Sequence, residues 1–369
     1  MMNYLVYRWF LKKTNREVDD TTEGFDTIAY PGKNAFVDTK NLPLKEYAIK
    51  ASYNSAYDGK NISLKQLSNV MYTGCRFIDL NVFVIDSSSL YVGFSSDNAP
   101  TMVDVSLPFH QAIDYINAFA FQIDTDAQNR IQKADYSAMV RKSMAPESKN
   151  QKRIQDTYTE YPLFLNIRVY RPPSSNIDIV SAIHPEVKKL KKQYLNPETG
   201  SAMKISQYTP LSELMGKVVV VMDIENILEV YTSPAPYDPE KIPASTRDAI
   251  DQMVNIKTGG QNWGTFYRYS DIVKNPTTPL KKLSDDISKV SYETNTLTMK
   301  LAYPSYSEKT EIPDALDFLK NYQIQCVPMR YYILGANLDK YNRMFDSNKT
   351  PMLPLYNAHT YLSSSKTQK

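Results

Sequence analysis

The side chains most often used in catalysis are sparse in this chain. Its 369 residues include three histidines, His110, His184 and His359, and two cysteines, Cys75 and Cys326. A histidine can act as a general acid or base, but these fall in a predicted helix, after a run without a strand pattern, and in the C-terminal tail. The sequence has no G-x-x-x-x-G-K-[ST] loop, dinucleotide-binding glycine fingerprint, C-x-x-C, H-E-x-x-H or G-x-S-x-G. The enzyme classes that these short motifs identify are therefore not indicated.

Composition narrows the function classes further. The 43 basic and 40 acidic residues leave a net charge of +3, whereas a nucleic-acid-binding protein usually carries a basic excess on one face. Cys75 and Cys326 lie far apart in apolar runs, so we expect buried thiols and a reducing compartment, inside a cell or within a virus particle. Met1–Leu11 is too short to span a bilayer and lacks a signal-peptide pattern. We therefore expect no nucleic-acid partner, no secretion and no transmembrane segment, with contact to a membrane surface as a minor alternative.

Alternating strand and helix patterns indicate the elements that would position functional side chains. Val218–Val221, four valines in a row, is typical of a strand buried on both faces. About eight strands with interleaved helices match the size of a (β/α)8 barrel. The predicted helices are Ile62–Met71, Leu107–Phe121 and Pro313–Tyr322. The predicted strands are Glu46–Ala51, Cys75–Ile85, Ser89–Phe94, Leu163–Tyr170, Lys217–Asp223, Met253–Lys257, Thr296–Tyr303 and Gln325–Tyr332.

We expect one α/β barrel domain with two attachments. The barrel comprises residues 43–355, the N-terminal arm residues 1–42 and the C-terminal tail residues 356–369. Within the barrel we expect a first half at 43–232, a polar helical insertion at 124–160, a connector region at 233–290 and a second half at 291–355. The connector is predicted because its prolines, four of them between 234 and 243, do not fit a helix interior or a central strand.

A series of degenerate motifs follows in order along most of residues 43–355. They are PLKEYAIKASYNSAY at Pro43–Tyr57, GCRFIDLNVF at Gly74–Phe83, LYVGFSS at Leu90–Ser96, YPLFLNIRVY at Tyr161–Tyr170, TPLSELMGKVVVV at Thr209–Val221, AYPSY at Ala302–Tyr306 and IQCVPMRYY at Ile324–Tyr332. Together they resemble the catalytic domain of the phosphoinositide-specific phospholipase C (PLC) family. The resemblance implies a distorted (β/α)8 TIM barrel of the PLC-like phosphodiesterase type.

The resemblance also implies that the family's catalytic histidines are absent. In the family, one histidine acts as general base and a second protonates the leaving group. The first corresponds to Tyr53 and the second to Val92 in this chain. Valine cannot donate a proton, so the resemblance implies a degenerate member without phospholipase activity.

The family's calcium site is altered in the same way. Calcium is held there by one asparagine and three carboxylates, and it neutralises the phosphate. The corresponding residues are Asn54, Asp79, Asn81 and Arg168, so that three carboxylates fall to one and a cation is added. Two unit charges about 4 Å apart interact by roughly 4 kcal/mol at an effective dielectric constant near 20. We therefore expect no calcium at this position, and no other cofactor.

Two interpretations of the remaining polar residues are open. One is an anion pocket in which Arg168, together with Arg330, binds phosphate. The other, which we favour, is an Asp79–Arg168 salt bridge that closes the former site. In that case the tyrosines Tyr53, Tyr170, Tyr331 and Tyr332 fill the emptied volume. We expect the candidate residues to converge at the C-terminal ends of the strands, where parallel barrels carry their sites; these residues are Tyr53, Asp79, Val92, Arg168 and Arg330.

If the barrel is not catalytic, we expect it to act by binding other proteins. Tyrosine and tryptophan dominate protein–protein hot spots, and the N-terminal arm carries Tyr4, Tyr7, Trp9 and Phe10. We therefore expect a structural or interaction subunit whose partners are other protein subunits of an assembly, for which a minor capsid or virion protein of a large DNA virus is one setting. The alternatives are a metal-independent phosphodiesterase and a phosphoinositide- or anion-binding protein.

Overall fold

The computed structural model describes residues 39–86, 88–96, 99–101, 107–121, 158–170, 178–223, 243–258, 265–269, 299–304, 312–322 and 324–364. Nearly all of the predicted arm, with Tyr4, Tyr7, Trp9 and Phe10, lies outside these residues, as do most of the predicted insertion and of the connector. The domain boundaries proposed from the sequence therefore stay predictions.

The largest sheet is built on four parallel strands in the order β2, β6, β7 and β8. Their bounds are Phe77–Val84, Leu163–Tyr170, Val218–Asp223 and Ile256–Thr258. Every residue of β2 is buried, as expected of a strand that is covered on both faces. Beyond β2 the sheet continues through β3 (Leu90–Ser96) to β4 (Ala99–Thr101) and β5 (Leu107–Pro108).

The direction of β3 differs from the parallel arrangement expected. β3 pairs antiparallel with β2, with Val82 opposite Val92. Only a short turn separates the two strands, and parallel neighbours need a crossover of a dozen or more residues, so a hairpin is the connection that fits.

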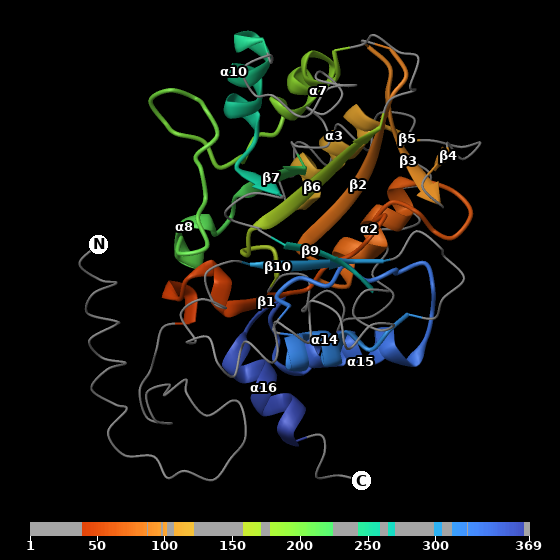
Figure 1. Ribbon diagram of the computed structural model, residues 1–369, viewed down its shortest axis with the longest axis vertical. Helices are drawn as coiled ribbons and strands as arrows, with labels where there is room; N and C mark the ends of the chain where they lie inside the picture. Colours follow the sequence, from red (N-terminus) through yellow and green to blue (C-terminus); the bar gives the residue numbers. More distant parts are fainter. Residues whose placement is uncertain are drawn as a thin grey trace.

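Helices cover the outer face of this sheet (Figure 1). They are α2 (Leu64–Tyr72), α3 (Phe109–Phe119), α7 (Ile179–Val187) and α10 (Ala244–Met253). Ser63 caps α2 by accepting a hydrogen bond from the Gln66 main-chain N–H, and Asp178 caps α7 in the same way. The core beneath the helices joins alternate residues of β2, such as Ile78 and Leu80, to the apolar stripes of the helices. The other face of β2 is thereby left to point toward the interior, where the site lies.

The second half of the chain forms two smaller strand pairs. β1 (Tyr47–Ile49) pairs antiparallel with β11 (Met352–Pro354), and β9 (Thr265–Arg268) pairs parallel with β10 (Lys300–Tyr303). The helices α14 (Ala315–Tyr322), α15 (Ala336–Ser347) and α16 (Leu355–Ser364) lie below these strands in Figure 1. The remaining elements are the short helices η1 (Thr39–Asn41), η2 (Leu44–Glu46) and α8 (Leu211–Leu214).

Isolated parallel bridges connect the sheets into one arc. Ala51, just after β1, bridges Phe77 of β2, and Ile49 of β1 bridges Cys326, which in turn bridges Leu301 of β10. The resulting order is β9, β10, the segment around Cys326, β1, β2, β6, β7 and β8. Among the described residues no pairing joins β8 to β9. The fold is a mixed α/β fold, and closure into a complete barrel stays a prediction.

The predicted strand Gln325–Tyr332 is not continuous. It pairs only at Cys326 and at Met329, which bridges Ser52. Pro328 between them has no N–H to donate to a ladder, which accounts for the interruption.

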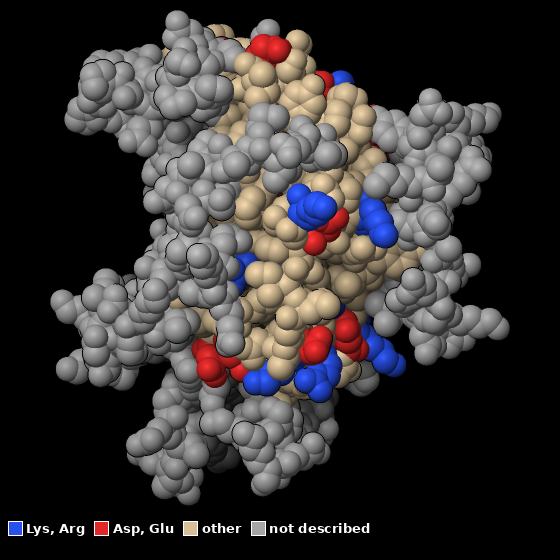
Figure 2. All heavy atoms as spheres, turned by 90° about the vertical axis from the view of Figure 1, so that its right-hand side faces the viewer, with Lys and Arg blue, Asp and Glu red and all other residues tan. Residues whose placement is uncertain are grey.

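The described surface carries both signs of charge. On the face shown in Figure 2, lysine and arginine side chains lie among aspartate and glutamate side chains. No helix among the described residues combines the length and the apolar character needed to cross a bilayer.

Candidate functional site

The candidate site occupies the inner face of β2 and β6. Because side chains alternate along a strand, Asp79 and Asn81 point away from the helix-covered face that holds Ile78 and Leu80. The parallel register places Asp79 beside Asn166 and Asn81 beside Arg168. The turn after β1 brings the neighbouring residues 53–55 against β2, where the Ser55 main-chain N–H donates to the Asp79 carbonyl oxygen at 2.8 Å.

The carboxylate of Asp79 is fully buried and accepts four hydrogen bonds. Arg168 supplies two, from Nε to Oδ1 at 2.7 Å and from Nη2 to Oδ2 at 2.5 Å. The Asn166 side chain donates to Oδ1 at 2.7 Å, and the Asn54 main-chain N–H donates to Oδ2 at 2.9 Å. A carboxylate has about four acceptor positions, so Asp79 has none left for a metal ion.

The N–H groups of the Arg168 guanidinium are likewise all used in hydrogen bonds. Besides its two bonds to Asp79, Nη2 donates to Asn54 Oδ1 at 3.1 Å, and Nη1 donates to the hydroxyls of Tyr53 at 3.3 Å and Tyr170 at 3.4 Å. These five bonds match the five N–H groups of an arginine. The guanidinium also lies over the rings of Tyr53, at 4.5 Å from the centroid, and Tyr303, at 5.6 Å.

Electrostatics favour the ion pair. Burial acts to lower the pKa of Arg168, but Asp79, aided by Tyr53 and Tyr170, reverses this and holds the pKa well above its ordinary value. Only 13% of the Arg168 side chain is exposed. Burial also raises the pKa of the Tyr53 phenol, so Tyr53 stays protonated at neutral pH.

Two asparagines complete the network. Asn54 has a left-handed backbone conformation, with φ at +46°, which asparagine tolerates better than most residues. The Asn81 side-chain amide donates to Asn54 Oδ1. Both residues are buried, and within the described structure Asn54 Nδ2 and Asn81 Oδ1 have no hydrogen-bond partner. The amide oxygen of Asn54, a potential metal ligand, faces the guanidinium of Arg168 instead.

The residues present do not fit the calcium ion that the resemblance implies. One carboxylate remains, all its acceptor positions are filled, and a cation occupies the space beside it. Elsewhere in the described parts of the chain, no three histidine, cysteine, aspartate or glutamate residues are grouped as metal ligands would be.

The network brings together most of the residues that the sequence predicts, but Val92 is a correction. Tyr53, Asp79 and Arg168 are in direct contact. Val92 instead packs into the core on the helix-covered face of the sheet, together with Val82. The hairpin register decides this, because a strand residue faces the side that its cross-strand partner faces.

Two further predicted residues interact with aromatic side chains outside the Asp79 hydrogen-bond network. Tyr332 packs edge-on against Tyr57, at 4.9 Å between ring centroids, and belongs to an aromatic cluster with Phe94. Arg330 is 1% exposed, and its charge acts on Tyr269, where it opposes the rise in the phenol pKa that burial causes.

Sequence reasoning missed two members of the network. Asn166 Nδ2 donates to the hydroxyl of Tyr303 at 2.8 Å as well as to Asp79. Asn166 precedes Arg168 by two positions on the same strand, so the period of two could have placed both on one face. Tyr303 lies at the end of β10, and no local signal assigns it to the site.

The remaining residues of catalytic type are elsewhere. Cys75 and Cys326 are buried free thiols, as predicted, and burial raises the pKa of both. His110 lies on α3 and His184 on α7, where burial lowers the pKa of His184. His359 falls within α16.

Comparison with known proteins supports the fold. A scan of protein-family models and a search of curated proteins give no match. Among solved structures, PLC21 of L. pealei is similar with a TM-score of 0.52 and 14% identity, over 85% of this chain and 37% of that chain. PLC21 of S. officinalis gives a TM-score of 0.49 and 12% identity, over 85% and 37%. A phosphatidylinositol-specific phospholipase C of S. aureus gives 0.43 and 11%, over 85% and 95%. The chain is thus similar in fold to L. pealei PLC21, and it spans 37% of the length of the PLC21 proteins.

Proposed function

We propose that this chain is a PLC-like barrel that does not cleave phosphodiesters and that works by contact with other proteins. The observation that carries the proposal is the mutual saturation of Asp79 and Arg168, which leaves no acceptor for a metal ion and no donor for a substrate phosphate. At the positions of the family's histidines, the protonated phenol of Tyr53 is not available as the base, and the side chain of Val92 has no proton to give to a leaving group.

The proposal includes a closed (β/α)8 barrel. Its support is the arc of parallel strands from β9 to β8 and the similarity to L. pealei PLC21. A complete ring would give the inner face of β2 and β6 the enclosed setting in which a buried ion pair is held tightly.

Activity assays test the catalytic part. The full chain should release no product from phosphatidylinositol vesicles or from a soluble phosphodiester, with or without millimolar calcium. Arg168→Ala and, as a control for the loss of a surface arginine, Arg247→Ala should be assayed beside it. Turnover by the intact chain that Arg168→Ala abolishes and Arg247→Ala leaves intact would refute the proposal.

The contact part concerns the N-terminal arm, residues 1–42, and partners that are other protein subunits. Replacing Trp9 and Phe10 by alanine should leave the far-UV circular dichroism unchanged, while the chain no longer co-sediments with the assembly in its native source. If this variant assembles normally, the interaction surface is not at Trp9 and Phe10 but in another part of the chain. We also predict that this assembly is a virus particle. Identifying the proteins that co-sediment with the chain tests this prediction.

The anion-binding alternative is less favoured by the contacts. Arg168 has no uncommitted N–H group, and Arg330 is 1% exposed, so a phosphate would have to displace Arg168 from Asp79. Titration with inositol phosphates should therefore give no saturable heat at this site.

A further inference from the structure

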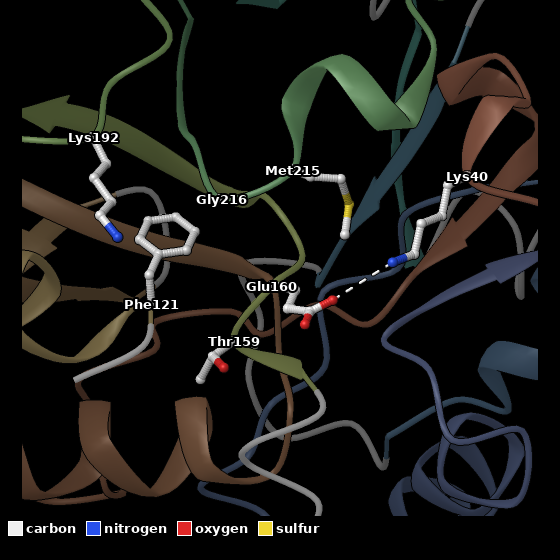
Figure 3. A pocket seen from close by; sticks show the side chains of 7 residues that line it. All are labelled: Lys40, Phe121, Thr159, Glu160, Lys192, Met215 and Gly216. Atoms are coloured by element: carbon white, nitrogen blue, oxygen red, sulfur yellow. Dashed lines mark ion pairs between the residues drawn. The ribbon is translucent and has the colours of Figure 1, made fainter.

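A pocket of about 340 Å³ lies apart from the residues of the Asp79–Arg168 network, and none of those residues lines it (Figure 3). Its lining includes Glu160, shortly before β6, and Gly216, shortly before β7, so it opens at the N-terminal ends of these strands. The volume falls within the range of small-molecule sites. The pocket is independent of the function proposed above.

The pocket has an apolar wall and two charged sides. Phe121 and Met215 supply the apolar surface. In Figure 3, Lys192 reaches over the Phe121 ring on one side, and the Lys40–Glu160 ion pair lies on the other. The ammonium of Lys192 is 5.2 Å from the ring centroid. A ligand that fits must therefore combine an apolar body with a polar end.

The charges favour an anion over a cation. Glu160 is paired with Lys40 at 3.5 Å, whereas no carboxylate in the described part of the chain lies within ion-pair distance of Lys192. The guanidinium of Arg76 lies over the same Phe121 ring at 5.2 Å, with only 3% of the residue exposed. Its three nitrogens donate to the carbonyls of residues 120, 161 and 162 rather than to a carboxylate. Arg76 thus adds positive potential through a low-dielectric region without contacting a ligand.

We propose that this pocket binds a small organic monocarboxylate, with its apolar body against Phe121 and Met215 and its carboxylate on the ammonium of Lys192. One negative charge fits because the two lysines of the lining are not equivalent: Lys40 is paired with Glu160, which leaves Lys192 to contact the ligand. Dianionic phosphate is held in proteins by bidentate arginine or by several donors. The carboxylate of Glu160 across the pocket further disfavours a second negative charge.

Titration of the full chain with benzoate tests the proposal. Saturable binding in the millimolar range or tighter is expected, with benzyl alcohol, benzylamine and phenyl phosphate each at least several-fold weaker. Lys192→Ala should weaken benzoate binding about tenfold or more, the size expected for one hydrogen bond to a charged group. Lys191→Ala is the matched control, since Lys191 is exposed but does not line the pocket, and it should leave the affinity unchanged.

Three results would overturn the proposal. The first is the absence of saturable benzoate binding to the intact chain. The second is an equal loss in Lys191→Ala and Lys192→Ala, which would show unspecific attraction to a basic surface. The third is tighter binding of phenyl phosphate or benzylamine than of benzoate. Glu160→Gln supplies a further check, because removing the opposing carboxylate should strengthen benzoate binding a few-fold, and weaker binding would contradict the assigned charges.

Discussion

Removing Arg168 should destabilise the fold far more than the loss of a surface arginine. Arg168→Met leaves the carboxylate of Asp79 fully buried with two of its four donors, those of Asn166 and Asn54. Breaking a buried ion pair from one side costs about 3–5 kcal/mol. Loss of the cation–π contact with Tyr53, at 4.5 Å, adds about 1 kcal/mol. We therefore expect the free energy of unfolding to fall by about 4–6 kcal/mol, a large share of the 5–15 kcal/mol of a typical domain.

A double-mutant cycle separates the ion pair from the rest of the site. Asp79→Asn alone leaves a buried guanidinium without its carboxylate and should cost a similar amount. Combining it with Arg168→Met leaves no unpaired charge, so the double variant should be more stable than either single variant and lie within about 2 kcal/mol of the intact chain. Urea unfolding followed by far-UV circular dichroism measures all four proteins. High salt should change the coupling little, because buried pairs are weakly screened.

The reasoning fails if either single substitution costs less than about 1 kcal/mol, as is typical of exposed pairs. It also fails if the cost of the double variant equals the sum of the single costs, since additivity is the behaviour of residues without shared partners. If Arg168→Met does not fold at all, the double variant still decides, because its recovery of folding requires the two charges to be coupled.

Three further predictions concern the position of the family's calcium site, a buried lysine and a glycine with positive φ. Arg168→Glu combined with Asn81→Asp should gain a calcium-dependent rise in melting temperature that the intact chain lacks, because three carboxylates then meet an asparagine oxygen at one point. Lys300→Met should stabilise the protein by about 1–3 kcal/mol at pH 7. Burial lowers the pKa of Lys300 to about 8, so below pH 8 the folded intact chain carries a buried charge that destabilises it. Urea unfolding at a series of pH values should show the stabilisation by Lys300→Met shrinking as the pH rises toward 10.5. Gly74→Ala should lower the free energy of unfolding in urea by more than about 2 kcal/mol, because φ is +88° and the added Cβ would lie 2.3 Å from a tyrosine ring. Gly200→Ala is the control: φ is +67° but the added Cβ meets open space, so the cost should be about 1 kcal/mol.

The strands of the central sheet could be predicted because their sequences are unambiguous. Leu163–Tyr170 is a strand with the bounds expected, and the valine run lies in β7. α15 was missed although its buried residues, among them Leu338, Tyr341 and Phe345, follow a helical spacing. β9 is a strand of only four residues, and its pairing with β10 comes from tertiary packing that a local pattern does not carry.

The site was predictable to the extent that it depends on alternation along β2. Asp79 and Asn81 share a face, and a parallel neighbour then brings Arg168 beside them. Val92 could not be placed from a motif, because a change of one residue in hairpin register moves a side chain to the opposite face of the sheet. Asn166 and Tyr303 enter the network through contacts between strands that are distant in sequence.

The ion-pair network and the pocket have opposite characters, and this separates their roles. On the inner face of β2 and β6, Asp79 and Arg168 satisfy each other, so the pair links the two strands and has no hydrogen-bonding group left for a ligand. At the pocket, Lys192 has a ring but no described carboxylate beside it. The groups proposed to bind a ligand lie instead at the pocket, whose lining includes residues shortly before β6 and β7. Arg168→Met combined with Asp79→Asn should therefore leave benzoate affinity unchanged, while Lys192→Ala should leave the unfolding free energy within about 0.5 kcal/mol of the intact chain. If benzoate affinity fell with the ion pair, the pocket and the ion-pair network would be coupled and their roles could not be assigned separately.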